Sequence, residues 1–107
     1  MSLWLTVHHE GEQEPYCWNL TGNLRKMCAA AGLECFWELN QSAEVPVGYL
    51  LPKVHRALIS MVERPSVYEQ CNAPNGWGTY DQFLPKLAKF HEALVRAGAL
   101  GTVEIRG

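Results

Sequence analysis

The two ends of the chain share one short pattern, in which apolar residues alternate with polar ones. The apolar positions of this pattern are Leu3, Leu5, Val7, Val103 and Ile105. A period of two residues is typical of a β-strand that turns one side to a core and the other to solvent. We therefore expect strands at residues 3–8 and 102–106, paired so that both chain ends join one small sheet.

Three segments between these ends have helical spacing instead. Apolar residues recur every three or four positions in residues 19–31, 52–64 and 79–97. Thr79 followed three residues later by Gln82 predicts a capping box at the start of the last helix. Gly32 and Gly98 are placed to end the first and last helices. A further short helical turn is expected at residues 66–71.

These elements predict an α+β fold in the order β-α-α-α-β, a small sheet of terminal strands covered by about three helices. At 107 residues, with 48% hydrophobic and 19% charged residues, the chain is expected to form a single compact domain over residues 1–107. Two strands alone make a marginal sheet. A third strand at residues 35–39, or sheet extension in a homodimer, would strengthen it. Residues 34–40 are also compatible with an apolar loop.

Charge and hydropathy narrow the functional classes. The formal net charge is −2, and the basic residues are scattered along the sequence. Proteins that bind a phosphate backbone usually cluster their basic residues, so we do not expect a nucleic-acid partner. Residues 1–7 lack the basic start of a signal peptide, and no apolar run is long enough to span a bilayer. We expect a cytoplasmic protein without a membrane partner.

The cysteines and histidines give weak signals for chemistry. Four cysteines at irregular spacing, without a C-x-x-C pair, favour reduced and mostly buried thiols over a disulfide framework or a zinc site. His8 and His9 point to opposite faces of a strand and match no metal-binding motif. No local signature supports a cysteine–histidine enzyme. We expect no metal, no cofactor and no catalytic residues, and favour a non-enzymatic role.

The strongest candidate site is the glycine-hinged aromatic turn at residues 75–80, Asn-Gly-Trp-Gly-Thr-Tyr, just before the last helix. Its companion is the polar helix start at residues 19–23, and we expect the two to lie side by side. Helix N-termini attract anions through free N–H groups. The alternative is a structural turn with Trp77 as a hydrophobic plug. The candidate binding residues are Asn19, Thr21, Asn23, Asn75, Gly76, Trp77, Gly78, Thr79 and Tyr80.

Two motifs carry a resemblance to a known family. Residues 19–27 read N-L-T-G-N-L-R-K-M and residues 75–80 read N-G-W-G-T-Y. In both, the chain resembles a family of small uncharacterised bacteriophage and prophage proteins that open and close with a short strand. Gly22 stands where the family has histidine, which removes a side chain that could act chemically, and Pro74 is offset by one position. The resemblance implies a phage or mobile-element origin and a role in binding and blocking host machinery.

Two functions follow as expectations. The first is a phage-type accessory protein that binds a host protein without catalysis and inhibits it, with a defence component as the target. The alternative is a binder of, or minor enzyme for, a small anionic, nucleotide-like ligand held by Asn19, Asn23 and the backbone of residues 76–79. A particle component that forms oligomers is a third class.

Overall fold

The alternating chain ends pair as expected. In the computed structural model, which describes residues 2–107, strand β1 (Ser2–His8) is antiparallel to β4 (Thr102–Arg106), with Leu5 opposite Ile105. The alternating apolar side chains of both strands are buried. The polar side chains between them lie on the other face. The predicted strands at both ends of the chain are therefore confirmed.

Two further strands complete a four-stranded antiparallel sheet in the order β2-β1-β4-β3. Strand β2 (Tyr16–Thr21) forms a hairpin with β1, and β3 (Ser42–Pro46) pairs with β4. Part of β2 had been expected to be helical. Leu20 fits the apolar face of a helix as well as the alternation of a strand, but the buried Trp18 two residues earlier fits only a strand. Hydrogen bonding to β1 makes residues 19–21 a strand instead of a helix.

Only the second part of the predicted helix at residues 19–31 is helical. Thr21 precedes a 3₁₀ turn, η1 (Gly22–Leu24), and its hydroxyl accepts a hydrogen bond from the backbone N–H of Asn23 at 3.4 Å. Helix α1 (Arg25–Ala30) follows and ends at Gly32, whose φ of 82° is the left-handed conformation expected of a terminating glycine.

The predicted third strand at residues 35–39 is wrong, because helix α2 (Cys35–Glu38) occupies this segment. Phe36 and Trp37 are consecutive and both buried. A strand with one face in solvent would bury only one of two neighbouring side chains, whereas a helical turn can bury both. The added strand is β3 instead, in which only Val45 is buried.

The three remaining helices are α3 (Val47–Glu63), α4 (Pro65–Glu69) and α5 (Tyr80–Ala97). Helix α3 begins five residues before the predicted start at Pro52, because Val47 and Leu50 belong to its buried stripe. The predicted order β-α-α-α-β is therefore incomplete. The observed order is β-β-η-α-α-β-α-α-α-β, with five α-helices among residues 2–107. The α+β class itself is confirmed.

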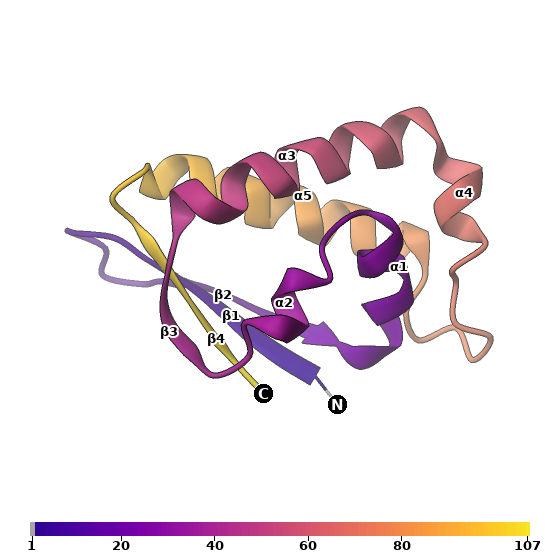
Figure 1. Cartoon of the computed structure of the whole chain (residues 1–107), viewed down its shortest axis with the longest axis horizontal. Helices are drawn as coiled ribbons and strands as arrows, with labels where there is room; N and C mark the ends of the chain where they lie inside the picture. Colours follow the sequence, from indigo (N-terminus) through magenta and orange to yellow (C-terminus); the bar gives the residue numbers. More distant parts are fainter. Residues whose placement is uncertain (1) are drawn as a thin grey trace.

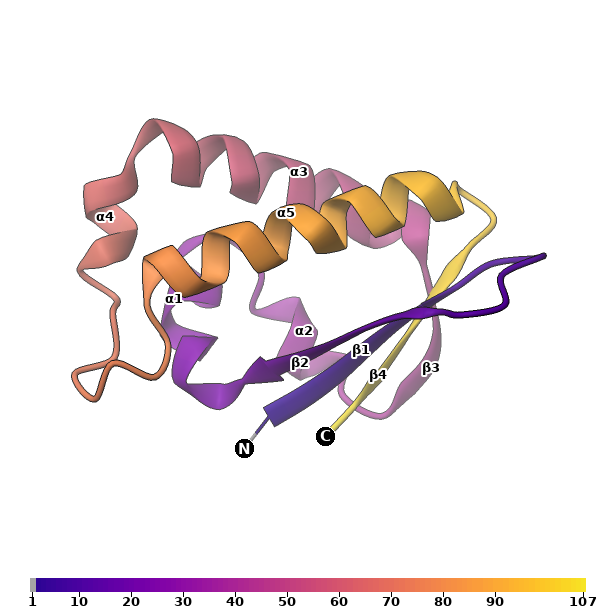
Figure 2. The same cartoon turned by 180° about the vertical axis from the view of Figure 1, so that it is seen from behind.

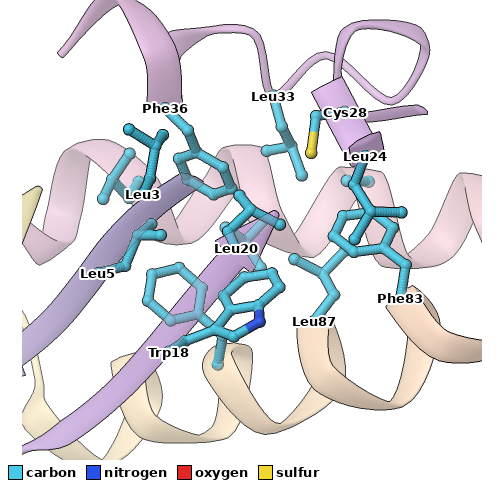
Figure 3. Packing of buried hydrophobic residues seen from close by; sticks show 14 of the residues in the cluster. Leu3, Leu5, Trp18, Leu20, Leu24, Cys28, Leu33, Phe36, Phe83 and Leu87 are labelled. Atoms are coloured by element: carbon cyan, nitrogen blue, oxygen red, sulfur yellow. The ribbon is translucent and has the colours of Figure 1, made fainter. Parts of the chain in front are cut away.

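Helices cover one face of the sheet. Figures 1 and 2 show α3 and α5 running together across it, with α1 and α2 beneath them near the N-terminus. Aromatic side chains join these layers: the ring of Trp18 lies 6.4 Å from Phe36 of α2 and 5.3 Å from Phe90 of α5. Figure 3 shows Trp18 and Phe36 within the core, among leucines of the sheet and of α5.

The cysteines correct one prediction. All four are free thiols, but only Cys28 is buried; Cys35 and Cys71 are partly buried and Cys17 is exposed. Burial raises the pKa of the Cys28 thiol far above its ordinary value, so this cysteine stays protonated and inert. Within residues 2–107, no helix has both the length and the apolar character required to cross a membrane.

Candidate functional site

The turn before α5 is held by its own side chains. The side-chain carbonyl of Asn75 accepts a hydrogen bond from the N–H of Trp77 at 2.9 Å. Gly76 has a φ of 77° and Gly78 a φ of 134°, a region that side-chain-bearing residues avoid. This loop conformation directs Trp77 outward, and 72% of the surface of Trp77 is exposed.

Gln82, in the first turn of α5, fastens this loop to the helix. Its side-chain carbonyl accepts hydrogen bonds from the N–H groups of Gly78 at 2.9 Å and Thr79 at 3.1 Å. Its amide nitrogen donates to the carbonyl of Gly76 at 3.2 Å. Thr79 is the N-cap, so the predicted capping box is confirmed.

Tyr80, the last residue of the predicted site, belongs to the core. It is 8% exposed, and its hydroxyl donates a hydrogen bond to the carbonyl of Met61 in α3 at 2.7 Å. Its backbone N–H is bound by the side chain of Asn72 at 2.7 Å. Loss of hydration raises the pKa of the Tyr80 phenol, which keeps it neutral. Tyr80 fixes the start of α5 from within the core.

The two sequence motifs meet at Gly78. A Cβ atom on Gly78 would lie 2.9 Å from the Cβ of Asn23 and 3.2 Å from its carbonyl. Only a glycine lets the turn approach η1 this closely. The expected adjacency of residues 19–23 and 75–80 is therefore confirmed, although Asn19 and Thr21 belong to a strand rather than a helix.

A surface pocket of about 380 Å³ opens beside this contact. We call it the Trp77 pocket. Its lining residues come from β2, η1, the glycine turn and α5: Trp18, Asn19, Thr21, Leu24, Trp77, Gly78, Gln82 and Lys86.

The pocket contains some of the predicted residues and not others. Four of them line it, namely Asn19, Thr21, Trp77 and Gly78. Asn23 supports the wall through its contact with Gly78, whereas Asn75, Gly76 and Thr79 shape the turn. Sequence reasoning missed Trp18, Leu24, Gln82 and Lys86. The i,i+4 spacing of Gln82 and Lys86 on α5 was an available signal, but Trp18 could not be placed without β2.

The pocket combines an aromatic wall with polar groups. Lys86 supplies a cation. The amide of Asn19 already donates to the Leu3 carbonyl, and the hydroxyl of Thr21 already accepts from the N–H of Asn23. Trp18 is 4% exposed, and its indole N–H has no hydrogen-bond acceptor within the described residues. This nitrogen is itself buried, so the part of Trp18 that lines the pocket is its apolar ring surface. The arrangement suits an apolar or aromatic group that carries an anion or a carbonyl.

The histidines form no pair with a cysteine. Among residues 2–107, their side-chain partners are carboxylates, a backbone carbonyl, or each other. His8 contacts Glu104 at 3.3 Å and His9 contacts Glu12 at 2.9 Å. The described residues contain no group of three or more His, Cys, Asp or Glu side chains arranged to hold a metal ion.

The chain was compared with protein-family models, with curated proteins and with solved structures. None of these comparisons found a match.

Proposed function

We propose that this protein is a non-enzymatic binding module that docks onto a partner protein through the Trp77 pocket. The observation that carries the proposal is the exposure of Trp77, 72%, at the rim of a pocket that two distant segments build together. Tryptophan is the residue most enriched at energetically dominant interface positions. The turn that presents it is already fixed by hydrogen bonds, so little conformational entropy is lost on docking.

The partner in this proposal is a host protein, a defence component that the module inhibits. Support comes from the resemblance of the two motifs to small phage and prophage proteins, since both motifs contribute residues to the same pocket. A pocket with an exposed aromatic rim and few charged groups is typical of a protein interface.

A small anionic, nucleotide-like ligand is the second candidate. It is favoured by Lys86, which offers a cation beside the aromatic wall of Trp18 and Trp77. Such a ligand would stack its ring on Trp77 and turn its anionic group to Lys86. In this alternative the Trp77 pocket binds a small ligand instead of a partner protein.

The first experiment is capture of a partner from host lysate on the immobilised protein, comparing wild type with Trp77→Ala and Trp4→Ala. Trp4 is the matched control, because it is another exposed tryptophan (51%) but does not line the pocket. We expect a stoichiometric partner that Trp77→Ala loses and Trp4→Ala retains. Equal loss in both variants, or no partner at all, would refute the protein-binding role.

The second experiment separates the two occupants. A thermal-shift panel of nucleotides and other anionic metabolites is run on the wild type. A ligand present at about 100 times its dissociation constant stabilises the folded state by roughly 2.7 kcal/mol, a readily measured shift. A shift that Lys86→Ala abolishes favours the small-ligand role, and an unchanged melting temperature across the panel removes it.

A further inference from the structure

Strand β2 forms one edge of the sheet. Among residues 2–107 its only strand neighbour is β1, so the outer backbone groups of Tyr16–Thr21 have no strand partner. An edge of this kind can accept an additional strand from another chain, through main-chain hydrogen bonds.

Two separate surface hollows lie along this edge, between β2 and α5. Figure 2 shows α5 running over β2. At the Thr21 end lies the Trp77 pocket, and at the Tyr16 end lies a second hollow of about 250 Å³, lined by Tyr16, Lys89, Glu92, Ala93 and Arg96. Tyr16 and Thr21 are the first and last residues of β2, so one hollow lies at each end of the strand. We call the two hollows, together with the β2 edge between them, the β2–α5 groove.

The helical wall of the groove is basic. Its charged residues are Lys86, Lys89, Glu92 and Arg96, which recur every three or four positions and therefore share one side of α5. The carboxylate of Glu92 is already paired with Arg96 at 2.7 Å. Lys86 and Lys89 have no ion-pair partner among the described residues. At the Tyr16 end, the adjoining loop places Glu12 and Glu14 near Arg96. The unpaired positive charge of the groove is therefore concentrated at Lys86 and Lys89.

We propose that the β2–α5 groove binds an extended acidic segment of the partner, which adds to β2 as a fifth strand. Main-chain hydrogen bonds would supply affinity, and acidic side chains on the α5 side of the added strand would face Lys86 and Lys89. A segment matching β2 spans roughly 20 Å, which brings one end of it to Trp77. The inference rests on the proposed function, because it specifies the chemistry of that partner.

A second copy of the chain is a poorer occupant of the same edge. Antiparallel pairing of β2 with β2 would continue the sheet through a twofold axis and place both α5 helices on the same side of it. Because the two strands run antiparallel, Lys86 at the Thr21 end of one copy would approach Lys89 and Arg96 at the Tyr16 end of the other, and like charges across an interface are unfavourable. Charge complementarity therefore favours an acidic strand from a partner over the β2 strand of a second copy, which would bring its own basic α5 helix.

The test begins with an unbiased library of linear peptides of about twelve residues, long enough to pair along β2. The library is selected on the immobilised full-length protein. We expect the selected sequences to be enriched in Asp and Glu at alternating positions. The best peptide is then measured for affinity at several salt concentrations, and binding should weaken as salt rises.

Variants and hydrogen exchange locate the bound peptide. Lys86→Glu with Lys89→Glu should weaken the selected peptide about tenfold or more, since two favourable charge contacts become repulsive. Arg56→Glu with Arg64→Glu is the matched control, because it reverses two exposed charges outside the groove. Bound peptide should slow hydrogen exchange of backbone amides in β2. Selected peptides without acidic enrichment, an equal loss in the double arginine variant, or unchanged exchange in β2 would each overturn the inference.

The outcomes also separate this inference from the proposed function. If Trp77→Ala abolishes partner capture while the double lysine variant and β2 exchange are unaffected, the Trp77 interface stands and the acidic strand is refuted. If acidic peptides protect β2 but Trp77→Ala changes no capture, the acidic strand stands and the Trp77 interface is refuted. A concentration-dependent dimer on a sizing column, with β2 protected in the dimer alone, would assign the groove to a second copy.

Discussion

Gly78 is the residue at which the two halves of the Trp77 pocket meet, and an added methyl group would push them apart. Gly78→Ala combines a positive φ of 134° with a Cβ placed 2.9 Å from the Cβ of Asn23. We expect a loss of about 1–3 kcal/mol in the free energy of unfolding, from backbone strain and from displacement of the turn. Urea denaturation followed by tryptophan fluorescence measures this loss.

Gly48 supplies the control for that measurement. It lies in the first turn of α3, its φ is not positive, and a Cβ there would meet no atom within 4 Å. Gly48→Ala should leave stability unchanged or raise it by up to about 1 kcal/mol, because alanine favours the helix. If Gly78→Ala and Gly48→Ala changed the free energy of unfolding equally, the close approach to Asn23 would not be the reason that position 78 requires glycine.

The histidine pair between α3 and α5 predicts a dependence of stability on pH. His55 Nδ1 and His91 Nε2 lie 3.3 Å apart, and loss of hydration together with the neighbouring His55 lowers the pKa of His91 below 6.5. The unfolded chain therefore binds a proton more readily than the folded chain. The stabilising contribution of neutral His91 is complete above pH 6.5 and declines as the pH falls toward its folded pKa.

Thermal melts between about pH 8 and pH 5 compare the wild type with two variants. His91→Gln should flatten the loss of melting temperature on acidification. His55→Gln should flatten it less, because loss of hydration, rather than His55, is the larger cause of the shift. An unchanged slope in His91→Gln would rule out this histidine as its source.

At the scale of elements, the start of α5 depends on one side chain. Gln82→Ala removes three hydrogen bonds, to the backbone groups of Gly76, Gly78 and Thr79. We expect a loss of about 1–2 kcal/mol in the free energy of unfolding, typical of a lost helix cap. Gln82→Glu keeps the acceptor for Gly78 and Thr79 and should retain most of the stability. Equal losses in the two variants would contradict the capping role.

Elements governed by neighbouring residues could be predicted from sequence, and elements governed by distant contacts could not. The Thr79–Gln82 cap and the glycine after α1 act within a few residues. Leu20 satisfied two periodicities at once, and the pairing of β2 with β1 resolved them. Strand β3 carries almost no signal of its own, since Val45 is its one buried residue and its pairing with β4 is irregular.

At the scale of the whole molecule, the same distinction applies to the candidate site. The glycine turn was recognisable locally, and its adjacency to residues 19–23 was expected. Lys86 and Trp18 enter the pocket only because α5 crosses the sheet edge formed by β2. That arrangement follows from the order β2-β1-β4-β3, in which the pairing of the two chain ends places β2 at an edge.

The sheet order also predicts that the chain cannot lose its last strand. Strand β4 is last in sequence but lies inside the sheet, bonded to β1 on one side and β3 on the other. Val103 and Ile105 are fully buried and together contribute roughly 3–6 kcal/mol, a large part of the 5–15 kcal/mol stability of a typical domain. Removing residues 102–107 should abolish the cooperative unfolding transition in urea and the near-UV circular dichroism signal.

The loop at Gly11 distinguishes this effect from a general sensitivity to altered chain length. Gly11 is exposed, a Cβ there meets no atom within 4 Å, and the loop joins β1 to β2 at the far end of the hairpin. Inserting a short Gly-Ser segment there lengthens one connection, and even a doubling of loop length costs only about 0.6 kcal/mol. The insertion variant should unfold cooperatively near the wild-type midpoint. A truncated chain that also unfolded cooperatively near this midpoint would contradict the prediction, because it would show that the core folds without β4.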